Sequence, residues 1–529
     1  MATIFNGVSW FDDRGETVNA HGACVVEEHG TYYLFGEYKT DDRNMFNGFA
    51  CYSSRDLATW HFERLVLPRQ SGGRLGPDRV GERVKVMRCP ATGKYVMLMH
   101  SDNLEYKDPM TLMAVSDTID GEYQIVGPLL CDGRPIRMWD IGTFQDHDGT
   151  GYLLIHGGHI YRLSDDYLSA ELVQPDTLEP YGESPAMAHV GDTYYLIMSN
   201  LTGWDRNDNF YLTAPDPSGP WTYRGNVAPQ GTCTWDSQSS FVFPLHTGHG
   251  DRLIYMGDRW SFPHQASCAS QVWLPLRFGD DVASVRDGSA DIATDADDAR
   301  RRSADDAALA DDAGVDMLDP VDAPTAMIGT ATESGAVAGR PADFGRPLLP
   351  RYADAWDSAT GEPVALRGET VPLSLFSNRH GDSASAVIEI ADTADDTATD
   401  EHNGTIGGDD AARLVLIGPR SKDGGVGRVV IRRIDGGADH VADRTAGSNV
   451  GRETGIVARS VSAPIVCQLF DCYAQSAYSG PLFVSKPLPA GRYEVTVQAL
   501  GETGLWIEKN GTRRGGADSY VNVWHALLL

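Results

Sequence analysis

Three acidic residues in the first half of the chain stand directly before apolar stretches rather than in surface turns. They are Glu82 in GERVKV, Asp140 in DIGTFQ and Glu183 in GESPAM. Carboxyl groups that come from different structural elements and meet at one point can share proton donation and proton acceptance. The structural alternative is a turn carboxylate at Glu183, and at Asp140 an Asp that caps a backbone turn. Chemistry therefore requires elements that bring these residues together.

A repeated strand pattern supplies such elements. A turn followed by an apolar, aromatic-rich segment recurs five times from Gly30 to Trp260, as GTYYLFGEY, GKYVMLMH, GTGYLLIHG, GDTYYLIMSN and DRLIYMGDRW. Second strand patterns such as YSSRDLATW and APDPSGPWTY lie between them. Five units of about four short strands, spaced roughly 40 to 65 residues apart, predict a five-bladed β-propeller catalytic domain over residues 1–279. A β-sandwich of similar length is the alternative.

The composition changes sharply after this region. Between Asp280 and Asp322, 14 of 43 residues are Asp, and no aromatic residue occurs between Gly279 and Asp343. Such a segment buries too little apolar surface to offset its ordering entropy, so we expect an acidic flexible linker over residues 280–343, with room for a short helix in DDARRRSADDAALADD. Strand patterns return afterwards, as in ARLVLIGP, GRVVIRRI and GRYEVTVQALG. They predict an accessory β-sandwich over residues 344–529 that resembles galactose-binding-like modules, with a loop at the acidic stretch 392–410. The fold class is all-β.

The formal charge of -30 limits the classes of partner that the protein can bind. This charge repels a phosphate backbone, and no Lys/Arg stripe offsets it, so nucleic acid is not expected as a partner. No stretch approaches the length of a membrane span, and the N-terminal residues lack the pattern of a secretion signal, so the expected location is cytoplasmic and no membrane partner is expected. The eight cysteines show no CxxC pair with matching His spacing. We expect them to be reduced and mostly structural.

The motifs within residues 17–278 resemble glycoside hydrolase family 43, and most of all its exo-β-1,3-galactanase branch. The matching segments are NAHGACVVEEHGTYYLFGEY, SSRDLATW, GERVKV, KYVMLMH, DIGTFQDHDGTGYLL, GESPAMAHVGDTYYLIMSNLTGW, SQSSFVF and YMGDRW. The resemblance covers about half of the chain. It implies an inverting glycosidase that releases galactose from the non-reducing end of β-1,3-galactan or β-1,3-galacto-oligosaccharides, which include those from arabinogalactan. Inverting glycosidases need one acid for the leaving oxygen and a second group that activates water on the opposite sugar face.

The resemblance assigns a role to each acidic residue. Glu183 aligns with the general acid, and its Pro-Ala-Met surround is expected to raise its pKa. Asp140 aligns with the carboxylate that tunes and orients the acid, although it follows Trp139 where many relatives carry Arg. In most of the family an Asp on the first inner strand activates water, but this stretch reads Asn-Ala-His-Gly from Asn19. The galactanase branch shares that absence.

The base is left open between two residues. The resemblance places Gln238, in DSQSSF, near the attacking water, where it would position the water or act as the imidic tautomer. Glu82 is the carboxylate alternative and could instead bind sugar hydroxyls. Chemistry alone favours Glu82, and the resemblance favours Gln238.

Other positions are candidates for sugar contacts. Tyr106, Thr202, Trp204 and Trp235 carry rings or hydroxyls of the kind that stack on galactose or bind its oxygens, although both tryptophans could equally pack blades together. His21 and His100 fit core imidazoles better than metal ligands. We predict no metal ligands and no cofactor, with a central structural ion left open.

Two other functions compete with the galactanase reading. The same fold and acid would serve an α-L-arabinofuranosidase or a β-xylosidase, but those activities in this family rely on the missing first-strand Asp. A catalytically silent carbohydrate-binding propeller fits the lack of an obvious base. The joint presence of Glu82, Asp140 and Glu183 argues against it.

Overall fold

The structure is a computed structural model that describes residues 2–247, 250–278, 347–391, 412–434, 463–503, 506–507, 513–514 and 518–529. The predicted linker at 280–343 and the predicted acidic loop at 392–410 lie outside these residues. Within them the chain is all-β, as predicted. Its helical elements there are three short turns: η1 (Gly73–Leu75), η2 (His156–Gly158) and α1 (Cys233–Asp236). No helix in this part of the chain is long and apolar enough to cross a membrane.

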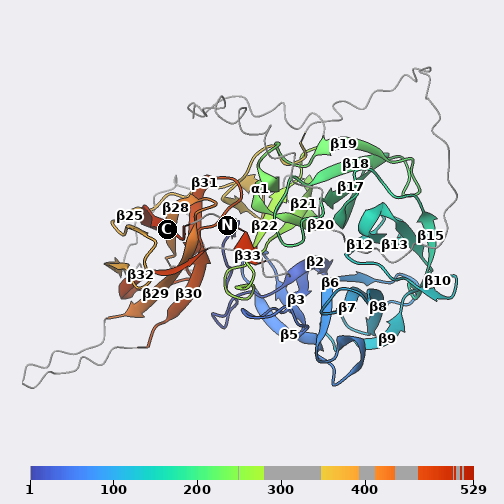
Figure 1. Ribbon diagram of the computed structural model, residues 1–529, viewed down its shortest axis with the longest axis horizontal. Helices are drawn as coiled ribbons and strands as arrows, with labels where there is room; N and C mark the ends of the chain where they lie inside the picture. Colours follow the sequence, from blue (N-terminus) through green and yellow to red (C-terminus); the bar gives the residue numbers. More distant parts are fainter. Residues whose placement is uncertain are drawn as a thin grey trace, which may run out of the picture. The chain divides into compact units, whose positions relative to one another are not determined.

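Five sheets follow one another along the first half of the described chain (Figure 1). The first sheet contains β2 (His21–Glu28), β3 (Thr31–Glu37), β4 (Gly48–Ser54) and β5 (His61–Pro68). The second contains β6 (Arg79–Arg88), β7 (Tyr95–Asn103), β8 (Met110–Ser116) and β9 (Gln124–Pro128). The third contains β10 (Leu130–Cys131), β11 (Arg134–Pro135), β12 (Ile141–Gln145), β13 (Gly151–Ile155), β14 (Ile160–Leu163) and β15 (Ser169–Gln174).

The last two of these sheets complete the series. The fourth contains β16 (Glu183–Val190), β17 (Thr193–Ser199), β18 (Phe210–Ala214) and β19 (Thr222–Asn226). The fifth contains β20 (Gln238–Thr247), β21 (Gly250–Arg259) and β22 (Ser270–Pro275). The five repeated aromatic segments of the sequence are the strands β3, β7, β13, β17 and β21, so their prediction as strands is confirmed.

The number of strands in a sheet departs from the expected four in two places. The third sheet has six strands because the chain leaving β9 runs along its outer edge, where β10 pairs in parallel with β15. The fifth sheet has three strands among the described residues.

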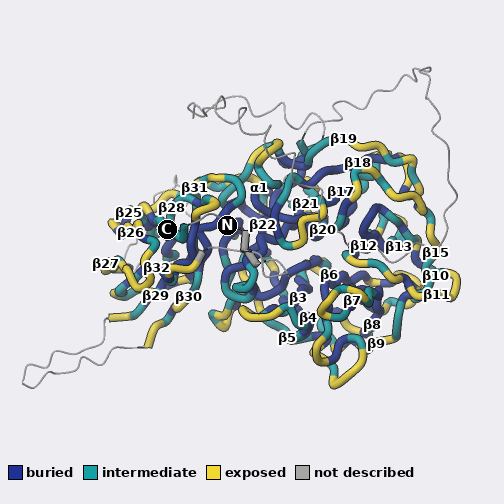
Figure 2. Tube along the Cα trace, viewed as in Figure 1, coloured by how far each residue is buried: buried dark blue, intermediate teal, exposed yellow. Residues whose placement is uncertain are grey.

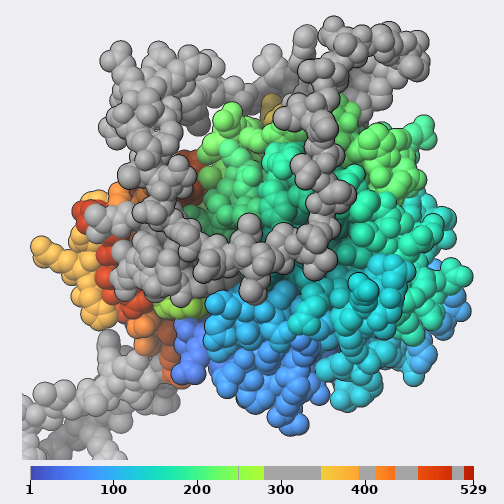
Figure 3. Space-filling model, turned by 45° about the vertical axis from the view of Figure 1, so that its right-hand side comes forward, coloured from blue at the N-terminus to red at the C-terminus, as the bar shows by residue number. Residues whose placement is uncertain are grey.

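The first strands of the five sheets lie in a closed ring. β2 contacts β6, β6 contacts β12, β12 contacts β16, β16 contacts β20, and β20 contacts β2. Figure 1 shows the sheets following this ring in chain order, and Figure 3 shows neighbouring sheets side by side at the surface, from blue through cyan to green. The residues at the starts of these five strands therefore lie close to one another at one end of the ring.

The cores lie between adjacent sheets rather than inside one common interior. One cluster joins the first and second sheets around Phe35, Met97 and Val84, and another joins the fifth and first sheets around Trp60 and Trp273. The first strands are covered on both faces, which explains why eight of the ten residues of β6 are buried even though they include Arg83 and Lys85 (Figure 2). Charged side chains there must find partners inside the ring.

A recurring irregularity marks the start of four first strands. The register shifts between His21 and Cys24, Glu82 and Lys85, Glu183 and Ala186, and Ser239 and Phe241. In β2, β6 and β16, the residue that follows His21, Glu82 or Glu183 has a left-handed backbone. These residues are Gly22, Arg83 and Ser184, with φ values of 55°, 54° and 54°. Bulges of this kind bend a strand and re-aim its side chains. They set the geometry of one end of the ring.

The second half of the described chain forms a β-sandwich. One antiparallel sheet contains β25 (Glu369–Val371), β36 (His525–Leu528), β28 (Leu414–Arg420) and β31 (Tyr478–Val484). The other contains β27 (Ser383–Ile390), β32 (Gly491–Thr503), β29 (Gly425–Arg433) and β30 (Val466–Asp471). Both sheets share one core, with Leu416 and Phe483 from the first and Val429 and Val497 from the second.

Three small sheets complete the described structure. They are β1 (Thr3–Phe5) with β23 (Ala355–Asp357) and β24 (Glu362–Pro363), β26 (Leu375–Ser377) with β35 (Val521–Val523), and β33 (Trp506–Ile507) with β34 (Arg513–Arg514). All eight cysteines are unpaired.

Candidate active site

The predicted acid–base residues lie at the same end of the ring. Glu183 and Gln238 are the first residues of β16 and β20, Asp140 directly precedes β12, and Glu82 stands at the bulge of β6. Glu82 and Gln238 are buried, and Glu183 is half-buried. The ring therefore brings these four side chains from four sheets to one end, which the sequence pattern alone could only suggest.

Arg83 links these side chains, and the sequence analysis missed it. Its Nη2 donates to Ser184 Oγ at 2.6 Å and to Gln238 Oε1 at 2.7 Å, and it lies 3.1 Å from Asp140 Oδ2. The backbone N–H of Arg83 donates to Glu37 Oε1 at 2.8 Å. The guanidinium is buried, so these contacts replace its hydration. Arg83 is the shared partner that holds the site together.

Asp140 is kept ionised by its neighbours. Burial by itself would raise the pKa of this carboxyl, but the Arg83 guanidinium and a 2.8 Å hydrogen bond donated by Ser184 Oγ lower it below its ordinary value. A permanent negative charge next to the site can orient and tune a neighbouring acid, which is the role that the family resemblance implies.

The orientation of the Gln238 amide is fixed by donor-only groups. Its Oε1 accepts hydrogen bonds from Arg83 Nη2 at 2.7 Å and from Trp260 Nε1 at 2.9 Å. Arg and Trp side chains cannot accept, so this atom must be the carbonyl oxygen. The amide nitrogen then donates to Glu183 Oε1 at 3.1 Å and to Ser199 Oγ at 3.2 Å. An imidic tautomer would place a hydroxyl hydrogen against two donors, which this arrangement disfavours.

The contact between Gln238 and Glu183 also bears on the choice of base. Inverting glycosidases separate the acid and the base by roughly 6.5 to 9.5 Å to admit a water molecule. Gln238 Nε2 lies 3.1 Å from Glu183 Oε1. From this position Gln238 is beside the acid rather than across the substrate from it.

Glu82 is the centre of a second polar cluster. Its Oε1 accepts hydrogen bonds from Tyr106 Oη at 2.7 Å and from Asn44 Nδ2 at 2.8 Å. Lys39 Nζ lies 3.9 Å from the same oxygen, and His100 Nδ1 lies 3.4 Å from Oε2. This cluster combines a carboxylate, a hydroxyl, an amide and two nitrogen donors, which are groups of the kind that can bind sugar hydroxyls.

His100 carries a positive charge in this cluster. Burial by itself would lower the pKa of His100, but the hydrogen bond with Asp102 and the Glu82 carboxylate outweigh it and raise the pKa to about 9. Ligand atoms of Glu82, His100 and Asp140 lie within 4.8 Å of one another, which is close enough for a metal cluster. Binding a cation there would require His100 to lose its proton, and the central ion stays an open prediction.

The raised pKa of His100 predicts a pH dependence of stability. The folded-state pKa of about 9 exceeds the unfolded value of about 6.5, so His100 contributes its full stabilisation below pH ~6.5 and loses it as pH rises to ~9. We expect the free energy of unfolding to fall across this window by an amount on the order of 3 kcal/mol from this group. Urea titrations at pH 6 and 9 measure it. His100→Asn should flatten the difference, and an equally steep difference in the variant would contradict the assignment.

The predicted sugar-contacting residues divide into two groups. Tyr106 belongs to the Glu82 cluster, and the 202–204 turn lies against the site because Gly203 O accepts a hydrogen bond from Gln238 Nε2 at 3.2 Å. Thr202 in this turn is exposed, and the Trp204 ring stacks on Phe262 at 4.7 Å. Their roles as sugar contacts stay predictions.

Trp235 has different surroundings. Its Nε1 donates to Leu349 O at 3.0 Å, and its ring lies 6.0 Å from the ring of Tyr352. These are the contacts of a packing tryptophan, which the sequence analysis held as the alternative to sugar binding. Trp235 sits in α1, where all four residues from Cys233 to Asp236 have positive φ, so this element is a left-handed turn that leads into Gln238.

Several site residues were given no role by sequence reasoning, although Arg83 lies in GERVKV and Trp260 in YMGDRW. Besides Arg83, these are Lys39, Asn44 and Trp260. Lys39 Nζ lies 2.5 Å from Glu37 Oε2 and donates to Asn44 Oδ1 at 2.7 Å. The available signal was an unexplained Arg next to Glu82 within an apolar strand, since a buried charge requires partners.

No protein-family model and no curated protein matches the chain. Among solved structures, a candidate exo-β-1,3-galactanase from Bifidobacterium bifidum s17 is 36% identical, covering 55% of this chain and 97% of that protein, with a TM-score of 0.48. A protein described as a GH43 β-1,3-galactosidase is 34% identical, covering 52% of this chain and 60% of that one, with a TM-score of 0.46.

A third structure matches the whole chain. The exo-β-1,3-galactanase from Phanerochaete chrysosporium, solved with β-1,3-galactotriose, is 20% identical, covers 100% of both chains and has a TM-score of 0.59. At this identity the match speaks for the fold alone, including both halves of the described chain.

Proposed function

The chain belongs to glycoside hydrolase family 43, and we propose that it is an inverting exo-enzyme that releases galactose from the non-reducing end of β-1,3-galactan or β-1,3-galacto-oligosaccharides. The observation that carries this proposal is the convergence of Asp140 and Gln238 on Arg83 at one end of the ring, with Glu183 accepting a hydrogen bond from Gln238. Relatives at 36% and 34% identity are described as acting on β-1,3-galactosidic bonds. We further propose that the five sheets are the blades of a five-bladed β-propeller and that residues 280–343 link it to the sandwich.

Glu183 is the proposed general acid. It is half-buried at the start of β16, and a nearby Asp140 carboxylate remains ionised. Two carboxyl groups in unequal surroundings favour one protonated and one charged group. Glu183 would donate its proton to the glycosidic oxygen as the bond to the anomeric carbon breaks.

Water activation is proposed to involve Glu82 and Gln238 in separate roles. Glu82 accepts the proton from water that attacks the anomeric carbon, because it is a carboxylate on another sheet from Glu183. Gln238, in its amide form, orients groups beside the acid, since both acceptor positions of its oxygen are already filled. The product leaves as α-galactose, with inverted configuration.

Product analysis tests this function. Wild-type protein is expected to release only galactose from β-1,3-galactobiose and galactotriose, with the α-anomer appearing first by proton NMR. p-Nitrophenyl arabinofuranoside and xyloside serve as controls and should not be hydrolysed. Activity confined to these pentosides would move the protein to the arabinofuranosidase or xylosidase group. No hydrolysis, with retained galactose binding, would make it a carbohydrate-binding propeller.

A further inference from the structure

One loop of the fifth sheet touches two parts of the candidate site. It spans residues 260–268, between β21 and β22. Trp260, at its start, donates to Gln238 Oε1 at 2.9 Å. Phe262, two residues later, stacks its ring on Trp204 at 4.7 Å with 27° between the planes. Ser261 therefore lies between a residue that fixes Gln238 and a residue that supports Trp204.

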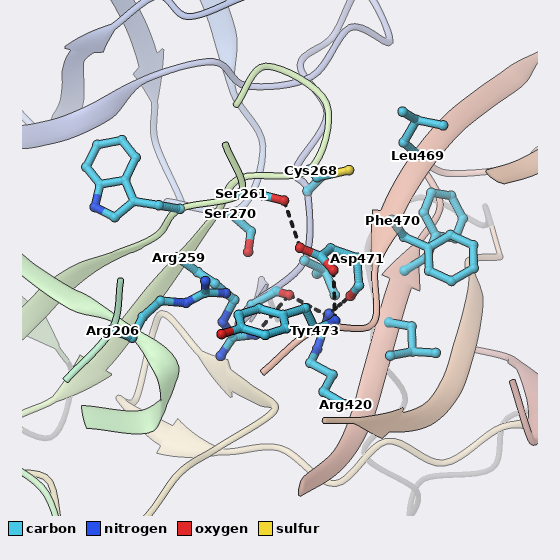
Figure 4. Close-up of a pocket in the computed structure, with 16 residues that line it drawn as sticks. Arg206, Arg259, Ser261, Cys268, Ser270, Arg420, Leu469, Phe470, Asp471 and Tyr473 are labelled. Carbon is cyan, nitrogen blue, oxygen red and sulfur yellow. Dashed lines mark hydrogen bonds between the residues drawn. The ribbon is translucent and has the colours of Figure 1, made fainter. Parts of the chain in front are cut away.

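The β-sandwich holds this same loop. Ser261 Oγ donates to Asp471 Oδ2 at 2.8 Å, and both residues are buried. Figure 4 shows this hydrogen bond as a dashed line between Ser261 and Asp471, which both line the same pocket. Gln468 donates to the backbone oxygen of Ser267, and Cys268 packs with Val426 and Leu500.

Asp471 is itself fixed from the sandwich side. Its Oδ1 accepts the backbone N–H of Tyr473 at 2.8 Å, and the backbone oxygen of Asp471 accepts from Arg420 Nη1. Arg420 also donates to Gly7 O at 2.9 Å and to Pro481 O at 3.1 Å. A buried carboxylate with this many fixed partners has little freedom to follow the loop. The loop must adapt to Asp471.

A second contact approaches the site from the other side. The Tyr473 ring lies 5.2 Å from the Arg206 guanidinium, whose Nε is 3.2 Å from Asp236 Oδ1. Asp236 is two residues before Gln238 and also pairs with Arg259. The backbone N–H of Gln475 also donates to Asp236 Oδ1 at 3.5 Å, so the sandwich contacts the segment before Gln238 as well as the loop beside it.

We propose that the β-sandwich is part of the catalytic unit, with Asp471 as a positioning residue that acts through Ser261 on Trp260 and Phe262. This inference rests on the proposed function of Gln238 and Trp204. The inference gives the sandwich a role in catalysis, in addition to any binding of a polymeric substrate. A small displacement of a positioning group is enough to slow an enzyme about a hundredfold.

The test uses the full chain and the variants Ser261→Ala, Trp260→Phe and their combination. Ser261→Ala is expected to lower kcat on β-1,3-galactobiose about tenfold, with a smaller change in KM. If Ser261 acts through Trp260, its effect is largely lost in the Trp260→Phe background, because coupled residues are not additive. Glu502→Gln is the matched control: it removes an exposed contact of His264, in the same loop, and should leave kcat unchanged.

A spectroscopic readout separates this inference from the proposed function. The indole N–H resonance of Trp260, identified by its absence in Trp260→Phe, is expected to shift in Ser261→Ala and not in Glu502→Gln. If the wild type hydrolyses nothing, the function fails and the resonance alone decides the inference. An active wild type whose kcat and Trp260 resonance are unchanged by Ser261→Ala overturns it, and full additivity of the two substitutions overturns the path through Trp260. Asp471→Asn, which retains the side-chain shape, replaces Ser261→Ala if that variant does not fold.

Discussion

Replacing Glu183 with Gln is expected to lower kcat on β-1,3-galactobiose by about 10² to 10⁴-fold, because the glycosidic oxygen then leaves without a proton. The amide has nearly the same shape as the carboxyl group and still reaches Gln238, so the fold should be retained. KM should change much less than kcat, since the substitution removes an interaction that strengthens in the transition state. Initial rates of galactose release measure both.

The leaving group sharpens this test. An aryl β-galactoside, whose leaving group is far more acidic than a sugar hydroxyl, needs little protonation, so Glu183→Gln should lose much less activity on it than on galactobiose. Glu179→Gln, an exposed glutamate four residues earlier, is the control and should behave like wild type on both substrates. Equal losses on the two substrates in Glu183→Gln would assign Glu183 a structural or binding role instead.

The sequence predicted the recurring strands because their pattern is local. An aromatic-rich segment after a turn identifies β3, β7, β13, β17 and β21 without knowledge of their neighbours. Glu82 and Glu183 were found for the same reason: each follows a Gly and precedes an apolar run in GERVKV and GESPAM. The acidic linker and the raised pKa of Glu183 stay predictions.

The parts that sequence reasoning missed depend on backbone conformations that L-residues rarely adopt. Arg83 and Ser184 have left-handed φ values of 54° at strand bulges, and no propensity rule places Arg there. Without the bulge, Arg83 would be read as a residue alternating outward along a strand. Trp235 stayed open between a sugar contact and a packing residue for a related reason: its partners, Leu349 and Tyr352, are more than a hundred residues away in the chain.

Arg83 is therefore the residue whose loss should affect both stability and activity most. Arg83→Met leaves the Asp140 carboxylate and the Gln238 oxygen buried without their cation, and removing one partner of a buried pair costs about 3 to 5 kcal/mol of folding free energy. Urea titration measures this loss. Arg88→Met, at the exposed end of the same strand, removes a guanidinium 3.8 Å from Glu28 and should cost about 0 to 1 kcal/mol.

Arg83→Lys separates the charge of this residue from its geometry. Lysine restores a cation but cannot span Ser184, Gln238 and Asp140 with a planar fork, so we expect most of the stability to return while kcat remains about 10²-fold low. Because Arg83 lowers the pKa of Asp140, the acidic limb of the kcat/KM profile should also move to higher pH in Arg83→Met. A wild-type kcat in Arg83→Lys would mean that a positive charge at this point is enough. The planar guanidinium would then not be needed to hold Gln238 and Asp140 in position.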